Sequence, residues 1–333
     1  MAVIRDTMPE FELFQPATVE DTLDLLARYG KDAWVLAGGL DSLEWFKDRI
    51  KRPKAVVDLS QVKELRGIRE FDGGLEIGAM TTLTEVVRHP VISEKYDILT
   101  HAAESAASPQ IRNQGTIGGN VSQDTRCWYY RNGWTCYRAG GNTCYSDTPT
   151  GMNREHAIFD ADRCVAVNPS DTAPALVALE SRMVIRSARG PREVMAEDYF
   201  IGPSHDITRM NVLGPGDLLT AVRIPATWAC ARFYFEKVRD RQVWDFPLVN
   251  IASATILSGD RIEKMRLVVN GVAAHPVRLR RVEEAVLGKP RNEDTAKTAG
   301  TIAISGAQPL QHNGFKVTLV RNLVKRAIRD KEA

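Results

Sequence analysis

The chain has 333 residues, enough for two or three subdomains with cores of their own. Its composition, 44% hydrophobic and 26% charged, is that of a globular protein, and a net charge of +2 gives no general reason to bind nucleic acid or anionic membranes. No segment approaches the roughly 20 apolar residues that cross a bilayer, and the first residues lack the apolar core of a signal peptide. We therefore expect a cytoplasmic protein with no membrane span and no nucleic-acid partner.

The first 107 residues predict alternating helices and strands separated by glycine or proline. In chain order these are a helix at 18–30 capped by Thr18, a strand at 33–37, a turn at Gly38-Gly39, a helix that opens at Asp41, a strand at 55–60, a hairpin across Asp72-Gly73, a short helix that ends before Pro90, and a helix at 95–107.

The second part of the chain begins with two irregular stretches, a polar loop at 108–126 and a segment of weak periodicity at 127–164. Near residues 226–230 the pattern changes to that of a sheet with helices on one face, which predicts a separate α+β unit. The expected elements are a strand at 164–167, a turn at Pro169, a helix and a strand up to 187, a three-stranded meander within 231–273 with its turn at 258–260, and helices at 277–288, 293–304 and 315–330.

Two glycine pairs stand out, Gly38-Gly39 in LAGGLDSL (36–43) and Gly118-Gly119 in TIGGN (116–120). Residues without a Cβ atom let a ligand approach the backbone, and the first pair also precedes a helix, whose first N–H groups favour an anion. Two such loops on one domain could hold a diphosphate, although a tight turn explains each pair alone at least as well. Neither pair fits the Gly-x-Gly-x-x-Gly pattern, so a Rossmann fold is not supported.

Four of the five cysteines lie between residues 127 and 164, with the spacing C-x8-C-x7-C-x19-C. Zinc sites favour closer C-x2–4-C pairs, and disulfides are disfavoured in the cytoplasm. Four thiolates are also the ligand set of a [4Fe–4S] cluster. Zinc, disulfides and a cluster all remain open on the spacing alone. The fifth cysteine, Cys230, is expected to be a small buried apolar residue.

Five motifs occur in the order found in a known family: LAGGLDSL, IGAMTTLTEV, SPQIRNQGTIGGNVSQ, NPSDTAPAL and KVRDRQVWDFPLV. The chain resembles, over residues 9–325, the FAD-binding medium subunits of the xanthine oxidase (molybdenum hydroxylase) family. The resemblance implies an α+β fold, with a vanillyl-alcohol-oxidase-type FAD-binding domain of two α/β subdomains and a C-terminal α+β domain of antiparallel sheet and helices. The implied bounds are 1–60, 61–226 with a cysteine-rich insertion at about 122–165, and 227–333.

The same resemblance implies a set of FAD-binding residues. Two loops would hold the diphosphate, and three further residues would lie near the flavin. The first loop is Val35, Leu36, Ala37, Gly38, Gly39, Leu40, Asp41 and Ser42; the second is Thr116, Ile117, Gly118, Gly119 and Asn120; the others are Asp171 (polar), Leu219 (apolar) and Lys237 (charged). Leu40 stands where the family usually has threonine, so one hydroxyl contact is lost there.

The insertion separates Asn120 from Asp171, which lie close in sequence in most members of the family. Two branches carry a cysteine-bearing insertion here that binds [4Fe–4S]: the β subunit of 4-hydroxybenzoyl-CoA reductase, which the chain resembles most in pattern, and the FAD subunit of a bacterial aldehyde oxidoreductase. The resemblance implies that the cluster ligands are Cys127, Cys136, Cys144 and Cys164, of which Cys164 is the least secure because Val165–Val167 read as a strand.

Each of several side chains around the cysteines could have either of two roles. Arginines would stabilise an anionic cluster or cover a solvated loop, and aromatic residues would shield it or pack the insertion. The arginines are Arg126, Arg131, Arg138 and Arg154, and the aromatic residues are Trp128, Tyr129, Tyr130 and Trp134. His156 is expected at the surface, and Asp240, Arg241 and Asp245 near the flavin edge.

We infer an electron-transfer flavoprotein subunit that contains FAD and a [4Fe–4S] cluster and has no catalytic residues for an organic substrate. The resemblance implies a large molybdopterin subunit and a small subunit with two [2Fe–2S] centres, assembled as a dimer of heterotrimers, with a ferredoxin-like external partner. The complex would reduce an aromatic CoA ester or phenol. The alternatives are an aldehyde or N-heterocycle oxidising dehydrogenase, a free-standing FAD dehydrogenase with a structural metal loop, and a non-enzymatic docking module.

Overall fold

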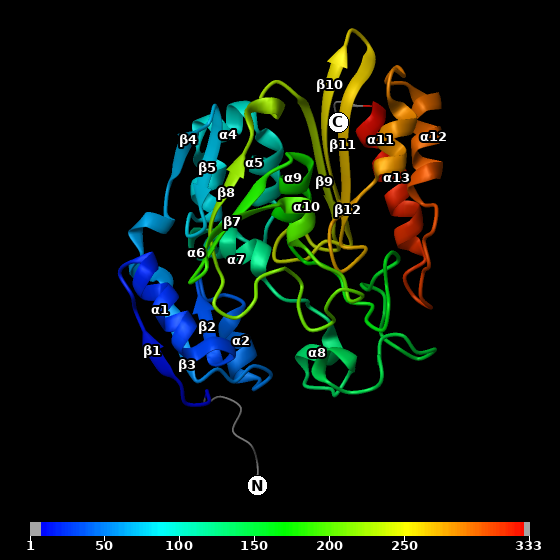
Figure 1. The fold of residues 1–333 in the computed structure, drawn as a ribbon. Coiled ribbons are helices and arrows are strands. Elements are labelled where there is room, and N and C mark those ends of the chain that lie inside the picture. The colour runs from blue at the N-terminus through cyan, green and yellow to red at the C-terminus, as the bar shows by residue number, and fades with distance from the viewer. Residues whose placement is uncertain (1–7, 330–333) are drawn as a thin grey trace.

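The computed structural model describes residues 8–329 (Figure 1). Two sequence predictions fall partly outside this range. They are the absence of a signal peptide, which concerns residues 1–7, and the end of the last helix at Asp330. No helix in the described range is long and apolar enough to cross a membrane. The part of the chain that the structure describes forms three sheets, each with its own helices, which agrees with the predicted α+β class.

The N-terminal sheet is parallel, with β1 (Glu12–Phe14), β3 (Ala55–Asp58) and β2 (Ala33–Leu36) in that order. The predicted helix is α1 (Val19–Tyr29): the Thr18 side chain accepts the Asp21 N–H at its start, and Gly30 ends it. Its apolar face packs against β3 because Val19, Leu23 and Leu26 lie on one side. The glycine turn follows β2 and leads into α2 (Ser42–Lys47), as predicted.

The second sheet is antiparallel, in the order β4 (Ile68–Phe71), β5 (Gly74–Gly78), β8 (Leu218–Ile224), β6 (Arg182–Ser187) and β7 (Gly190–Met195). The predicted Asp72-Gly73 hairpin is confirmed, with positive φ at both residues. The helices that pack around this sheet and its core are α3 (Leu83–Arg88), α4 (Pro90–Lys95), α5 (Asp97–Glu104), α7 (Ile117–Ser122), α9 (Thr172–Ala178) and α10 (Ala196–Tyr199). A further helix, α6 (Pro109–Gln114), has no buried residue and lies against α3.

The prediction of a loop over 108–126 was wrong in part, because two short helices form there. Ser108 caps α6 and Thr116 caps α7 with their side-chain oxygens. Six-residue helices rich in glycine and asparagine leave little periodic pattern in the sequence. Their capping residues were the available signal.

The third sheet is antiparallel, in the order β12 (Val277–Arg278), β11 (Arg261–Asn270), β10 (Val249–Ser258) and β9 (Arg232–Val238). Three strands form the predicted meander with its turn at 258–260, and β12 replaces the expected start of a helix. One face is covered by α11 (Arg280–Val286), α12 (Glu293–Ala303) and α13 (Phe315–Arg329), shown in orange and red in Figure 1.

The insertion between α7 and α9 contains little regular structure. It forms α8 (Trp128–Arg131) and one 3-10 turn, Tyr137–Ala139. The other 3-10 turns of the described residues lie outside the insertion, at Gly30–Asp32, Leu59–Gln61, Lys63–Leu65 and Ala226–Trp228. The predicted strand at 164–167 is absent, since Val165 and Asn168 make isolated backbone bonds to Ala157 and Ala273 instead of a ladder. In Figure 1 the insertion lies between α2 and the loop that precedes α13.

The C-terminal domain holds the second half of the insertion in place. Asn313 donates through Nδ2 to the carbonyl oxygens of His156 and Ala157, at 3.0 and 3.1 Å. Lys316 is fully buried and donates through Nζ to the carbonyl oxygens of Glu155 and Gly271, at 2.8 and 2.7 Å. Because these contacts come from the loop before α13 and from α13 itself, the shape of the insertion depends on the last quarter of the chain.

Candidate functional site

The two glycine loops lie against each other. A Cβ atom built on Gly38 would stand 2.4 Å from the carbonyl oxygen of Gln114, and one on Gly115 would stand 3.4 Å from Leu40. Gln114 donates through Nε2 to the carbonyl oxygen of Gly38 at 2.7 Å. Only glycine fits at position 38, because the backbone of Gln114 and Gly115, just before the second loop, fills the space that a side chain would need.

The first loop presents free backbone donors. Within residues 8–329 no acceptor lies in hydrogen-bonding range of the N–H groups of residues 38–42. Gly39 has φ +76°, and Leu40, a predicted contact, is partly exposed. A row of unpaired N–H groups between a strand and a helix is suited to an anion such as a diphosphate.

The second loop has its donors already paired. The N–H groups of Ile117 and Gly118 bond the carbonyl oxygens of Thr81 and Ala79, both at 2.9 Å, and that of Gly119 bonds the Thr116 hydroxyl at 3.0 Å. The N–H groups of these three residues are therefore not free to bind a ligand. The two glycines can still leave room for one, because they carry no side chain. A Cβ on Gly118 would stand 2.8 Å from Ala79.

Asn120 connects the second loop to the segment after the insertion. Its Oδ1 accepts from the hydroxyls of Ser170 and Thr172, both at 2.6 Å. Leu219, on β8, is buried in the core that includes Ile117. The sequence prediction did not include Ser170 or Thr172, although NPSDTAPAL was singled out as a motif.

Asp171 and Lys237 are brought together from distant parts of the chain. Lys237 Nζ lies 2.6 Å from Asp171 Oδ2 and also donates to the carbonyl oxygens of Ser105 and Asp245 at 3.0 and 2.8 Å. Asn250 Nδ2 donates to Asp171 Oδ1 at 3.1 Å. Burial raises the pKa of Asp171 to about 6 and lowers that of Lys237, while their mutual attraction opposes both changes.

Replacing Lys237 by methionine should destabilise the protein by about 3–5 kcal/mol, because it leaves the buried Asp171 carboxylate without its cation. Thermal unfolding should show a lower melting temperature. Lys297→Met, at an exposed position of α12, is the matched control and should leave it within error. Equal melting temperatures for the two variants would contradict the ion pair.

The predicted flavin-edge residues Asp240, Arg241 and Asp245 lie in one loop. This loop contacts Lys237 through the carbonyl oxygen of Asp245, and it contacts the insertion through Arg154. Asp245 accepts the N–H groups of Asp240 and Arg241 on Oδ2, at 3.1 and 2.9 Å. Asp240 in turn receives two hydrogen bonds of 2.8 Å from Arg154. Arg154 therefore pairs with this loop, and it is absent from the lining of the cysteine cavity.

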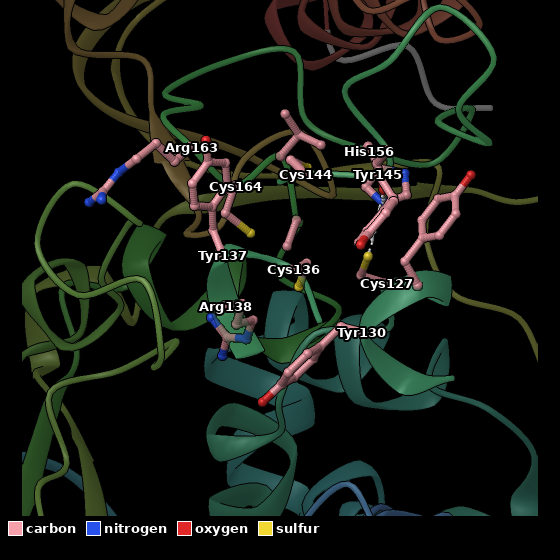
Figure 2. A pocket seen from close by; sticks show the side chains of 14 residues that line it. Cys127, Tyr130, Cys136, Tyr137, Arg138, Cys144, Tyr145, His156, Arg163 and Cys164 are labelled. Carbon is pink, nitrogen blue, oxygen red and sulfur yellow. Dashed lines mark hydrogen bonds between the residues drawn. The ribbon is translucent and has the colours of Figure 1, made fainter. Parts of the chain in front are cut away.

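The four clustered cysteines line one small cavity (Figure 2). All five cysteines are free, so the disulfide alternative is not observed. In the described residues no group of three or more His, Cys, Asp or Glu side chains is arranged to hold a single metal ion. The thiolates of a [4Fe–4S] cube each bind a different iron atom, so they surround a larger space than the ligands of one zinc ion do. The [4Fe–4S] cluster stays a prediction that the four lining cysteines allow.

Cys127 has polar neighbours that the sequence prediction missed. His156 Nε2 lies 3.4 Å from Cys127 Sγ and 2.9 Å from Ser146 Oγ, and the hydroxyl lies 3.7 Å from the sulfur. The surface prediction for His156 was wrong: it is buried, and burial lowers its pKa to about 4. Nδ1 of this histidine has no partner in the described structure. A lone histidine in a loop carries no periodic signal.

The cavity does not favour bare thiolates. Burial raises the pKa of Cys164 to about 12 and raises that of Cys127, and the neighbouring cysteines add to the effect for both. Arg138 is the buried cation beside them, and it bonds Asp124 and the carbonyl oxygen of Ile207. Burial therefore favours the protonated thiols of Cys127 and Cys164.

Of the remaining arginines and aromatic residues near the cysteines, Tyr129 and Tyr130 line the cavity and the others do not. Arg126 and Arg131 pair with Asp41 of the first glycine loop. Tyr130 is buried, whereas Trp128 and Trp134 are exposed, so these tryptophans do not shield the cavity from water. Cys230 was predicted to be buried but is exposed, because the turn after β8 carries it to the surface next to Trp228, which fills the core instead.

Two family models match the chain in succession. Residues 9–227 match the FAD binding domain in molybdopterin dehydrogenase, and residues 233–331 match the CO dehydrogenase flavoprotein C-terminal domain. The chain belongs to the FAD-binding medium subunits of the molybdenum hydroxylase family. This confirms the family resemblance and the fold class. The special closeness to 4-hydroxybenzoyl-CoA reductase stays a prediction.

Individual relatives cover almost the whole chain. The carbon monoxide dehydrogenase medium chain of Hydrogenophaga pseudoflava is 27% identical over 325 residues, 96% of each chain. The aldehyde oxidoreductase FAD-binding subunit PaoB of Escherichia coli is 29% identical over 303 residues, 90% of this chain and 91% of that one. The structure of carbon monoxide dehydrogenase from Hydrogenophaga pseudoflava that lacks the Mo-pyranopterin moiety superposes with a TM-score of 0.77 over 97% of each chain, at 27% identity.

Proposed function

We propose that this subunit binds FAD with its diphosphate on the free N–H groups of residues 38–42. That row of donors, next to a position where only glycine fits, is the observation that carries the assignment. The second loop, residues 116–120, would close the cavity by shape. Asp171, Leu219 and Lys237 would stand near the flavin ring, with Lys237 held in place by Asp171.

A [4Fe–4S] cluster on Cys127, Cys136, Cys144 and Cys164 is the second part of the proposal. Four free cysteines around one cavity support it, as does the buried Arg138 beside them. When bound, FAD exchanges electrons in pairs and the cluster exchanges them one at a time. A subunit with both could therefore connect two-electron and one-electron partners. His156 and Ser146 would donate hydrogen bonds toward the Cys127 sulfur, which favours the electron-rich thiolate and the reduced cluster.

The subunit would work in a complex with a large molybdopterin subunit and a small [2Fe–2S] subunit. Named relatives support this, since they are medium chains or FAD subunits of larger dehydrogenases. Their names also favour an oxidised substrate, because they include carbon monoxide, aldehydes and nicotinate. The aldehyde or N-heterocycle dehydrogenase therefore gains support over the aromatic reductase, and a ferredoxin-like acceptor suits the one-electron cluster.

The isolated chain should bind FAD but oxidise no organic substrate. The chain carries only electron-transfer groups in this proposal, and the substrate would bind the molybdopterin subunit. The test is steady-state oxidation of aldehydes and N-heterocycles with an artificial acceptor, for the single chain and for the full complex. Turnover by the single chain at a rate similar to that of the complex would support the free-standing dehydrogenase instead.

A further inference from the structure

Asp41 belongs to the first glycine loop, yet its carboxylate contacts the cysteine insertion. Oδ1 accepts hydrogen bonds from Arg126 and Arg131, each at 2.5 Å. Oδ2 accepts from Nε1 of Trp45 at 3.2 Å and from the N–H of Asp124 at 3.4 Å. Both oxygens are therefore engaged by protein groups, which leaves the backbone N–H of Asp41, and not its side chain, for an anionic ligand.

The two arginines lie on either side of Cys127. Arg126 precedes it, and Arg131 ends α8, the short helix that Cys127 caps. Arg131 Nε also donates to the carbonyl oxygen of Thr125 at 2.9 Å, and the Thr125 hydroxyl accepts the Cys127 N–H at 3.3 Å. A single carboxylate thus fixes both ends of the turn that presents Cys127 to the cavity.

The arginine pair depends on this carboxylate. Both guanidinium groups contact the same oxygen, Asp41 Oδ1, so the two positive charges lie close together. The Arg126 guanidinium lies 4.4 Å from the Phe246 ring centre, and that of Arg131 lies 3.9 Å from the Trp45 ring centre. Without the carboxylate, two like charges would be packed side by side with little compensation.

Glu44 is a weaker partner of the same arginines. It lies 3.2 Å from Arg131 and 3.8 Å from Arg126, and its side chain is 61% exposed, compared with 25% for Asp41. Exposed ion pairs contribute little. Glu44 therefore offers a matched control, since it has the same charge and the same partners but sits outside the enclosed contact.

We propose that Asp41 couples the two cofactor sites. A cluster on the four cysteines would order the insertion, the ordered arginines would position Asp41, and Asp41 would set the backbone of residues 38–42 that receives the FAD diphosphate. The inference rests on the proposed function. By linkage, each cofactor strengthens binding of the other by the same factor, about 5–150-fold in typical coupled proteins.

The test measures the FAD dissociation constant of the flavin-free full chain by fluorescence titration. Cys144→Ser, which removes a cluster ligand, should weaken FAD binding about tenfold relative to the cluster-loaded wild type. In the Asp41→Asn background the same cysteine change should alter the constant by less than about twofold. Glu44→Gln should keep the full coupling. Arg126→Gln breaks the contact from the other side and should reproduce Asp41→Asn, which guards against a folding defect in one variant.

Two results would overturn the coupling: equal FAD affinity with and without the cluster, or full coupling retained in both Asp41→Asn and Arg126→Gln. Iron content, measured on the same samples, shows whether the cluster or only the coupling is absent. Wild-type protein without iron would remove the proposed cluster and this coupling together. If the protein contains iron but its FAD dissociation constant is the same with and without the cluster, only the coupling is ruled out.

Discussion

Cys144→Ser should reduce the iron content from about four atoms per chain to less than one, with acid-labile sulfide falling in parallel. The cavity holds four cysteines and no spare acidic ligand, so a serine hydroxyl at this position leaves one iron without a thiolate. Cys144 lines the same cavity as Cys127 and Cys164, which places it among the other sulfurs. FAD should still bind when it is supplied in excess.

Cys230→Ser is the matched control, because this cysteine is exposed and lies outside the cavity. It should retain about four iron atoms. Cys164→Ser tests the ligand that the sequence supports least, and it should behave like Cys144→Ser. Full iron and sulfide in Cys144→Ser, measured on anaerobically purified protein, would show that the cavity holds no four-thiolate cluster.

Gly38→Ala should weaken FAD binding by about tenfold or more. The new Cβ would stand 2.4 Å from the carbonyl oxygen of Gln114, which is backbone and cannot rotate away. The first loop must then move away from Gln114, and overpacking of this kind typically costs about 1–3 kcal/mol. The N–H groups of residues 38–42, which we propose bind the diphosphate, would be displaced with the loop. FAD titration of the purified chain measures the effect.

Gly314→Ala controls for the substitution itself, because no atom lies within 4 Å of the added Cβ and its φ is not in the left-handed region. It should leave the FAD dissociation constant unchanged. If Gly38→Ala also leaves the constant unchanged while the melting temperature holds, then the close approach of the two loops is not part of the FAD site.

Short-range features were predictable from the sequence because their causes are local. The Thr18 cap, the Gly30 stop and the Asp72-Gly73 hairpin each depend on residues within one turn, and all three are found. The family motifs likewise identified the cofactor domain, which the family models confirm. The residue-level FAD contacts remain predictions, although Asp171 and Lys237 do meet at 2.6 Å.

Features set by tertiary packing were not predictable in the same way. His156 is buried because Asn313, 157 residues later, holds its carbonyl oxygen, and Cys127 receives its sulfur contact as a result. The strand expected at Cys164 did not form because its segment lies against the C-terminal domain and has no strand to pair with. Spacing along the chain contains no information on such contacts.

The decisive measurement is iron, acid-labile sulfide and extracted flavin per chain in anaerobically purified wild-type protein. The account predicts about four iron, about four sulfide and one FAD, with an electron paramagnetic resonance signal of a reduced cubane after dithionite treatment. One FAD with zinc, or with no metal at all, would contradict it. In that case the flavin subunit would stand, and the four cysteines would form a structural or docking loop.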